Sequence, residues 1–165
     1  MKFIDPNIRF GANGTRTHRA ARRPYIRMAE LYLNLAECYA ALENTTEALA
    51  NLNEIRGRAG LKELTDADLT GDMTLMDWVR NERFVELYEE GFRYYDVRRW
   101  MIAEQEGVMS GAMYGIKIYW INSSPQEFRY TPYLYENRTF TKKMYLHPFS
   151  TNEVNKGYLI QNPGY

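Results

Sequence analysis

The sequence predicts a mainly α-helical protein with a small β or irregular segment near its C-terminal end. Apolar residues recur at intervals of three and four between residues 24 and 59, as they do along one face of an α-helix. Capping patterns separate this region into individual helices, and an aromatic-rich stretch of shorter period follows residue 105. These three observations favour helical hairpins as the main body of the fold.

A chain of 165 residues is long enough for one domain with a hydrophobic core. We expect an extended leader over residues 1–23, a helical scaffold over 24–104, and a β or irregular segment with a tail over 105–165. The leader has few apolar anchors and contains the basic run RTHRAARR. Because the formal net charge is +0 and no nucleic-acid-binding motif accompanies this run, we expect a solvated or partner-covered leader and no nucleic acid as partner.

The single cysteine, Cys38, excludes an internal disulfide framework. Its place in a helical pattern predicts a small buried hydrophobe rather than a reactive thiol. No segment has the apolar length of a signal peptide or of a membrane-spanning helix. The chain as given is therefore expected to be soluble, which leaves open an export signal in a longer parent.

The first helix is expected from Pro24 onward, with an apolar stripe at three- and four-residue spacing. The members of this stripe are Met28, Tyr32, Leu35, Ala36, Tyr39 and Leu42. Asn44 can cap a second helix, with Glu47 three residues further on. The stripe of the second helix consists of Ala48, Leu52, Ile55 and Ala59.

These two helices form a hairpin whose spacing is similar to that of a tetratricopeptide repeat (TPR). Counting Ala29 as the first repeat position, large and small residues fall where that repeat requires them. Only one clear copy is seen, and a solenoid normally needs about three repeats. We therefore expect TPR-like packing but no independent repeat array.

The second half of the chain predicts two more helices and a strand. A capping box at Thr74 precedes a helix expected from about residue 75 to 90, and Gly91 is suited to end it. A further helix is expected over 92–104. Beyond it, IKIYWI (116–121) has the composition of a strand, and SSP that of a turn.

The helix that starts near residue 75 has two carboxylates on or beside its apolar face. At 100° per residue, Glu82 lies within the arc of the apolar side chains and Glu86 lies next to it. Isolated charges at such positions are costly, so each carboxylate needs a cation or hydrogen-bond donors.

Three explanations of Glu82 and Glu86 are open. In the first, they form a structural ion-pair network with Arg93, Asp96 and Arg99 of the following helix, since a planar guanidinium meets a carboxylate with two bonds. In the second, they are an acid and base for glycoside hydrolysis, although such pairs usually face each other across a cleft. In the third, they bind a metal, but both histidines lie far away in sequence. We predict the ion-pair network, no catalytic residue and no metal site.

Five blocks of sequence carry a resemblance to a known family. In chain order they are RMAELYLNLAECYAAL, EALANLNEIRGRAGL, NERFVELYEEGFRYYDVRRW, YLHPFSTNEV and the terminal QNPGY. Together they resemble the C-terminal part of the RagB/SusD family, over a stretch from about Arg27 to Tyr165. Several blocks in the right order make this resemblance more specific than any single motif.

The resemblance implies an α-α superhelix of TPR-like helix pairs and a function in nutrient uptake. Such proteins are non-enzymatic lipoproteins at the surface of the outer membrane in Bacteroidetes-type bacteria. They capture glycans or other nutrients and pass them to a SusC-like, TonB-dependent transporter, and no cofactor is expected. Family members are several times longer and carry a lipidated cysteine, so we interpret this chain as a C-terminal portion, with any membrane anchor on the missing N-terminal part.

Aromatic residues after position 116 are the candidates for glycan contact, because a flat ring can stack on the apolar face of a sugar. The candidate residues are Trp120, Tyr130, Tyr133 and Tyr135, with Asn122 and Gln126 as polar neighbours. No family motif marks these positions. The plainer alternative, which we favour, is that the rings pack the β-like segment onto the helices.

Three classes of function follow. The leading hypothesis is a non-catalytic glycan- or nutrient-binding component of a SusCD-type uptake system, of which this chain is largely the helical scaffold. The second is a protein-interaction scaffold without a ligand site of its own. The third is a helical glycoside hydrolase that uses Glu82 and Glu86. The identity of the glycan, of the transporter and of the oligomeric state is not encoded in any recognisable motif.

Overall fold

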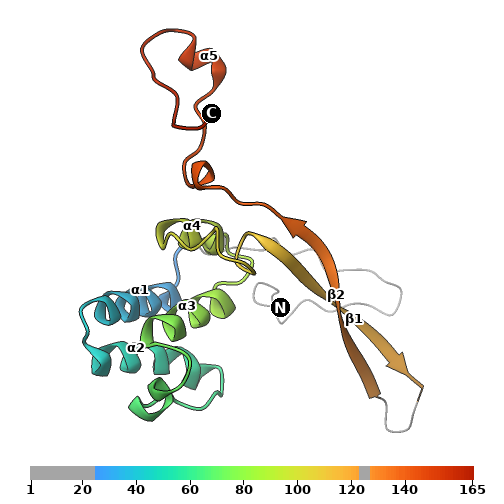
Figure 1. The fold of residues 1–165 in the computed structure, drawn as a ribbon. Helices are drawn as coiled ribbons and strands as arrows, with labels where there is room; N and C mark the ends of the chain where they lie inside the picture. The colour runs from blue at the N-terminus through green and yellow to red at the C-terminus, as the bar shows by residue number, and fades with distance from the viewer. Residues whose placement is uncertain (1–24, 123–126) are drawn as a thin grey trace, which may run out of the picture. The chain divides into compact units, whose positions relative to one another are not determined.

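The computed structural model describes residues 25–122 and 127–165. The chain divides into two compact units, Met1–Tyr88 and Glu89–Tyr165, which are described separately below. Helices dominate, and a small two-stranded antiparallel sheet lies near the C-terminal end (Figure 1). The predicted mainly α fold class is therefore confirmed. The predicted leader and the SSP turn lie outside the described residues.

The described part of the first unit contains three α-helices packed side by side (Figure 1). They are α1 (Met28–Ala41), α2 (Thr45–Arg58) and α3 (Leu75–Glu86). The side chain of Asn44 accepts a hydrogen bond from the Glu47 N–H at 3.3 Å, so α2 begins at its predicted cap. Thr74 and Asp77 form the predicted capping box of α3. Local capping thus sets where both helices start.

The core of the first unit contains one large, fully buried side chain from each helix. These are Leu33 of α1, Leu52 of α2 and Val79 of α3. Small residues, among them Ala36 and Ala48, are also fully buried and let the helices approach closely. This interleaving of large and small residues is the packing that the TPR-like spacing requires.

The buried face of α1 differs from the predicted stripe. Ala29, Leu33 and Ala36 are buried, whereas Met28, Leu35 and Leu42 of the predicted stripe are exposed. α1 has apolar residues on two sides, and only the side that contacts α2 and α3 is covered within the unit. Periodicity alone could not choose between two apolar faces.

The predicted burial of Cys38 is also wrong, because its side chain is exposed. It lies on the side of α1 that the packing of the unit leaves open. In α2, Ala48, Leu52 and Ile55 are buried as predicted, and Ala59 at the helix end is exposed.

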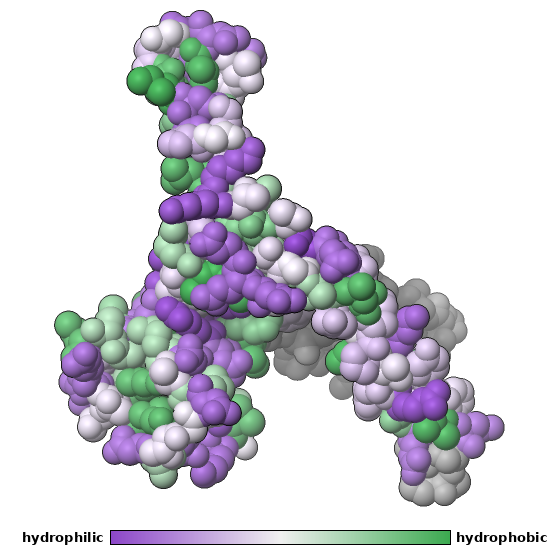
Figure 2. Space-filling model, viewed as in Figure 1, coloured by the Kyte–Doolittle hydropathy of each residue, from purple (hydrophilic) through white to green (hydrophobic). Residues whose placement is uncertain are grey.

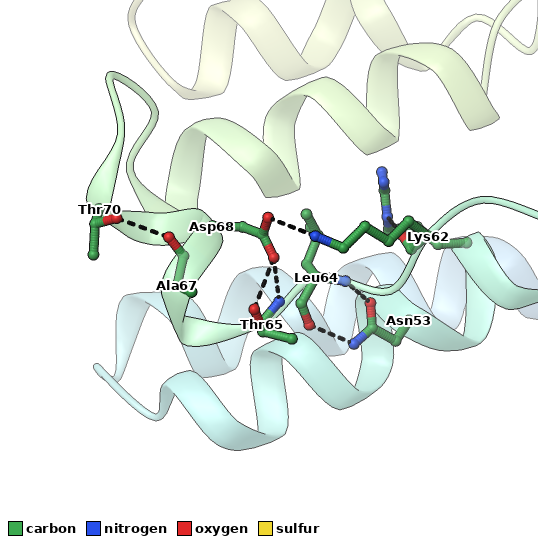
Figure 3. A network of polar contacts seen from close by, with 8 residues as sticks. Asn53, Lys62, Leu64, Thr65, Ala67, Asp68 and Thr70 are labelled. Atoms are coloured by element: carbon green, nitrogen blue, oxygen red, sulfur yellow. Dashed lines mark hydrogen bonds and ion pairs between the residues drawn. The ribbon is translucent and has the colours of Figure 1, made fainter.

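The segment between α2 and α3 is held by side-chain bonds to the backbone (Figure 3). The amide of Asn53 donates to the Leu64 carbonyl at 2.9 Å and accepts from the Leu64 N–H at 2.8 Å. Asp68 accepts from the Thr65 N–H and hydroxyl at 2.9 and 2.8 Å and pairs with Lys62 at 3.2 Å. These contacts place a 3₁₀ turn, Asp66–Thr70, beside the helices.

The second unit begins with a glycine turn and a short helix. Gly91 has a φ of +87°, a conformation that L side chains rarely adopt, and it precedes α4 (Phe92–Arg99). α3 ends at Glu86 rather than at the expected residue 90, and α4 ends five residues before the expected 104. Val97, Ala103 and Phe140 form the buried core of this unit.

A long β-hairpin follows α4. It consists of β1 (Gly111–Ile121) and β2 (Glu127–Arg138), paired antiparallel with one irregularity between Met113 and Tyr114 (Figure 1). The sequence predicted only the last half of β1 as a strand and left β2 as short strands or irregular structure. β2 pairs with β1 from Glu127 to Arg138, and within it Tyr135 alone has no opposite residue.

The tail consists of two short helical turns and an ordered end. The turns are η2 (Lys142–Tyr145) and α5 (Thr151–Val154). The Gln161 side chain bonds both the N–H and the carbonyl of Phe149, at 2.9 and 3.0 Å. The Tyr165 hydroxyl donates to the Leu146 carbonyl at 3.2 Å. The terminal QNPGY therefore closes a loop.

Among the described residues, every helix is too short or too polar to span a bilayer.

The Thr65 contacts predict a specific acid sensitivity. Hydrogen bonds from the Thr65 N–H and hydroxyl lower the pKa of Asp68 from 3.8 to about 2. A carboxyl group whose pKa is lower in the folded than in the unfolded chain stabilises the fold at pH values above its unfolded-state pKa. This contribution disappears as the pH falls through the folded-state pKa. We expect Asp68→Asn to lower the urea midpoint at neutral pH and the difference from the native chain to shrink between about pH 4 and pH 2.

The matched control is Asp72→Asn, which removes an exposed carboxylate from the same segment. A pH profile shared by both variants would contradict the assignment of the effect to the Thr65 contacts.

Candidate functional site

The two carboxylates predicted on α3 are both buried in the first unit. Glu82 is 4% exposed and Glu86 is 7% exposed. A carboxylate Oε2 of Glu82 lies 2.9 Å from Nη1 of Arg56. Glu86 is held by Arg27 at 2.6 Å and by Arg58 at 2.7 Å, one on each carboxylate oxygen. Each buried negative charge therefore faces an arginine.

Arg27 also donates from Nη2 to the backbone carbonyl of Glu86 at 2.7 Å. This carbonyl is one of the last in α3, where helix carbonyls lack a partner inside the helix. The positive guanidinium at this end also complements the helix dipole. Arg27 thus neutralises a side chain and caps a helix end at once.

A buried arginine of α3 contacts α1. Arg83 is 3% exposed and donates from Nη1 to the side-chain oxygen of Asn34 at 2.7 Å. Its Nε lies 3.7 Å from a carboxylate oxygen of Glu37. Charges on α3 are therefore matched from both α1 and α2.

These three arginines were not among the partners expected. Arg93 and Arg99 of the following helix, which the sequence suggested as the cations of Glu82 and Glu86, belong to the second unit, and their part in the network stays a prediction. Within the first unit, the cations come from the residue before α1 and from the last turn of α2. The signal that could have identified them is the placement of Arg27, Arg56 and Arg58 at the ends of their helices.

The remaining members of the predicted network lie in the second unit. Asp96 of α4 is 5% exposed and accepts two bonds from Arg99, from Nε at 3.1 Å and Nη2 at 2.9 Å. Burial lowers the pKa of the Arg93 guanidinium below its usual value, and the negative charge of Asp96 opposes this shift. Asp96 and Arg99 of α4 thus form an ion pair within their own unit.

α4 is linked to the tail by a cation and two rings. The Arg98 guanidinium lies 3.5 Å from the Tyr94 ring centroid and 5.1 Å from that of Phe140. The Tyr94 hydroxyl is 3.0 Å from Nε2 of His147, and the two rings stack. Desolvated cation–π contacts of this kind contribute on the order of 1–2 kcal/mol.

The β-hairpin presents two chemically different faces. Successive side chains of a strand point to opposite faces, so each directly opposed pair shares one. The hairpin apolar face comprises the pairs Tyr114–Leu134, Ile116–Pro132, Ile118–Tyr130 and Trp120–Phe128. The hairpin polar face comprises the pairs Gly115–Tyr133, Lys117–Thr131, Tyr119–Arg129 and Ile121–Glu127.

This geometry separates the four predicted ligand-binding rings. Trp120 and Tyr130 lie on the apolar face, and Tyr133 lies on the polar face. Tyr135 is the extra residue at the irregularity, because Leu134 and Glu136 oppose consecutive residues of β1. Of their predicted polar neighbours, Asn122 is exposed after β1, and Gln126 lies outside the described residues.

Each aromatic ring of the polar face has a cation beside it. The Lys117 ammonium is 4.7 Å from the Tyr133 centroid, and the Arg129 guanidinium is 5.2 Å from the Tyr119 centroid. The Tyr133 ring also lies over Gly115, so closely that a Cβ there would be 2.9 Å from a ring carbon. Gly115 thus makes room for the ring, and rings and polar groups occur together on this face.

Within the described ranges, no three potential ligands of the His, Cys, Asp and Glu types gather as a metal site would require.

Comparison with known proteins places the chain in a family. The model of the SusD family matches residues 1–165. The chain belongs to the SusD family. Proteins of this family are generally non-catalytic binding proteins. A comparison with curated proteins gives no match.

Two solved structures are similar to this SusD-family chain. A structure of BT4246 shares 41% sequence identity at a TM-score of 0.80, over 99% of this chain and 27% of that one. A selenomethionine form of BT4246 shares 40% identity at the same TM-score, over 99% and 28%. The chain therefore spans little more than a quarter of the length of the solved chains that it matches.

The buried pair of Glu82 and Arg56 predicts a large stability effect. Glu82→Ala leaves the Arg56 guanidinium without its carboxylate, and breaking a buried pair in this way costs about 3–5 kcal/mol. We expect a corresponding loss in the free energy of unfolding, measured by urea denaturation. The control, Glu54→Ala, removes an exposed glutamate of α2 and should change that free energy by about 0.5 kcal/mol or less.

The double variant Glu82→Ala, Arg56→Ala should cost less than the two single changes added together, because no charge is then left alone. A Glu82→Ala effect as small as that of the control would show that the pair does not hold α2 and α3 together.

Proposed function

We propose that this chain is part of a non-catalytic nutrient-binding component of an outer-membrane uptake system. The observation that carries the proposal is the match of the SusD family model along the whole chain. In this function the helices act mainly as scaffold, the ligand is an oligo- or polysaccharide, and the partner is a SusC-like, TonB-dependent transporter. The parent protein sits at the cell surface and is attached by a lipid anchor on a part not spanned by this chain.

The placement of the acidic residues supports a binding role over hydrolysis. Glu82 and Glu86 lie on adjacent turns of one helix. Arginines form ion pairs with one carboxylate oxygen of Glu82 and with both carboxylate oxygens of Glu86. A glycosidase needs one carboxyl group to donate a proton and another to attack or activate water, on either side of the scissile bond. Carboxylates buried against arginines are poorly suited to both tasks.

The hairpin polar face is the part of the chain best suited to contact a glycan. Sugar rings stack on aromatic side chains by their apolar faces and form hydrogen bonds at their edges. Tyr119 and Tyr133 supply rings, and Lys117, Arg129 and Thr131 supply donors and acceptors beside them. Trp120 and Tyr130 offer rings too, but their face has no charged or amide group at its rim.

Native affinity electrophoresis tests glycan binding by this chain. The chain is run through gels that contain plant, host or microbial polysaccharides, and its mobility is compared with that in a glycan-free gel. We expect one polysaccharide to retard the native chain and Tyr133→Ala to relieve the retardation, because the ring that stacks on the sugar and contacts Lys117 is lost. Trp120→Ala is the matched control on the other face of the hairpin and should leave retardation unchanged.

Relief by Trp120→Ala alone would move the contact to the apolar face. The absence of retardation in every gel would assign this chain to the scaffold role alone, as in the interaction-scaffold alternative.

The same polysaccharides test the enzymatic alternative. We expect no release of reducing ends above the buffer background after prolonged incubation with the native chain. Release that disappears in Glu82→Gln and Glu86→Gln, with circular dichroism unchanged, would overturn the non-catalytic assignment.

A further inference from the structure

The hairpin polar face carries two cations that no carboxylate neutralises among the described residues. Lys117 lies on β1 and Arg129 on β2, and each contacts a tyrosine ring instead of an acid. The other cation of the two strands, Arg138, forms an ion pair with Glu136. Figure 2 shows hydrophilic residues beside apolar ones at the surface of the hairpin. The positive charges of the polar face therefore remain available to an anion.

The one carboxylate of this face lies at its end. Glu127 is opposite Ile121, one step along the face from Arg129 and two steps from Lys117, and the described structure contains no ion pair between it and either cation. Two cations and one carboxylate leave the face with a net positive charge, whereas the whole chain has a formal net charge of +0. The excess of positive charge is thus a local feature of the hairpin.

Rings and cations alternate across the two strands of this face. Arg129 is directly opposite Tyr119, and Lys117 is diagonal to Tyr133. Lys117 is also diagonal to Arg129, which sets the two positions about 7–8 Å apart. Two couples of one ring and one cation therefore follow each other along the ribbon. An extended sugar chain can place successive sugars over both couples.

One of the two rings is held in position by a glycine. A Cβ at residue 115 would lie 2.9 Å from a carbon of the Tyr133 ring, so only Gly115 lets the ring lie this close to the backbone of β1. Because the ring is placed by this contact before a ligand arrives, less ordering is needed on binding. Gly115 thus acts as a positioning residue for the Tyr133 ring.

The chemistry of the face selects the charge of the ligand. Lysine, arginine and threonine are well hydrated, so the exposure of this face does not by itself call for an occupant. An exposed cation–π contact is weaker than a charge-assisted hydrogen bond to an anion. A carboxylate or sulfate on a sugar can therefore draw Lys117 and Arg129 into ion pairs. A neutral glycan offers only hydroxyl groups and gains less from the same cations.

We propose that the hairpin polar face binds acidic glycans, whose sugars carry carboxylate or sulfate groups. This inference rests on the proposed function, because it names the class of glycan that the site suggested there would take. The forked guanidinium of Arg129 suits the two oxygens of a carboxylate, and the Lys117 ammonium pairs with either anion as a point charge. Tyr119 and Tyr133 stack on the sugars, and the Thr131 hydroxyl lies between the two couples.

Affinity electrophoresis with pairs of polysaccharides that share a backbone and differ in charge tests the proposal. The pairs are polygalacturonate with its methyl ester, hyaluronan with carboxyl-reduced hyaluronan, and dextran sulfate with dextran. We expect the acidic member of at least one pair to retard the native chain more strongly than its neutral member, and added salt to weaken this retardation. Retardation by a uronate supports a carboxylate as the recognised group, and retardation by dextran sulfate supports a sulfate.

Substitutions on the polar face should change the affinity in opposite directions. Lys117→Gln and Arg129→Gln should each raise the dissociation constant for the acidic polysaccharide by about fivefold, the upper range for one exposed ion pair. Glu127→Gln should lower it, because a carboxylate that repels the ligand is removed. The matched control is Lys142→Gln, which removes the same charge from an exposed position outside the hairpin and should leave the dissociation constant unchanged. Circular dichroism checks that each variant keeps its helices.

Three results would contradict the proposal. Equal retardation by both members of a pair, relieved by Tyr133→Ala, would keep glycan binding at this face and refute its preference for acidic sugars. A loss in Lys142→Gln as large as that in Lys117→Gln would assign the effect to the net charge of the chain. No retardation in any gel would refute an acidic-glycan site in this chain, and only the scaffold role of the proposed function would then stand.

Discussion

The ion pairs between α3 and the two preceding helices are the contacts on which the first unit depends. Glu82, Arg83 and Glu86 occupy positions on α3 that are turned towards α1 and α2, where unpaired charges would prevent packing. Arg27, directly before α1, and Arg56 of α2 neutralise the carboxylates. Asn34 of α1 accepts a hydrogen bond from Arg83. A buried ion pair adds little net stability, but it permits only the arrangement in which both partners meet. The charges thus select how three short helices pack.

This arrangement also explains why three blocks of the family pattern contain so many charged residues. Arg27 belongs to the first block, Arg56 and Arg58 to the second, and Glu82 and Glu86 to the third. Each block contributes one side of an interaction whose other side is in another block. The QNPGY block has a comparable role in the second unit, because its side chains bond the backbone of residues 146–149. Much of the family pattern in this chain therefore maintains structure, and the hairpin faces outside those blocks remain available for binding.

Two apolar surfaces stay open in the described structure, the outer side of α1 and the hairpin apolar face. The first lies on α1 in the first unit, opposite the side that packs against α2 and α3. The second lies on the hairpin in the second unit, opposite the hairpin polar face. The chain spans little more than a quarter of the solved chains that it matches, so related proteins have additional polypeptide that can cover such surfaces. The two surfaces differ in shape, one a helix stripe and the other a twisted ribbon. They are therefore suited to partners of different shape.

The sequence by itself determined the helices of the first unit, the family and the presence of charges that require partners. Capping boxes, helical spacing and Gly91 are local signals, and each acts within a few residues of the boundary that it sets. The tertiary structure decided which side of α1 is buried, which arginines meet Glu82 and Glu86, and which aromatic rings share a face of the hairpin. α1 has two apolar sides, so its own sequence does not select the one that packs. The ion pairs join residues dozens of positions apart. The register of the two strands decides which face of the hairpin each ring occupies, because a shift of one residue moves every side chain to the other face.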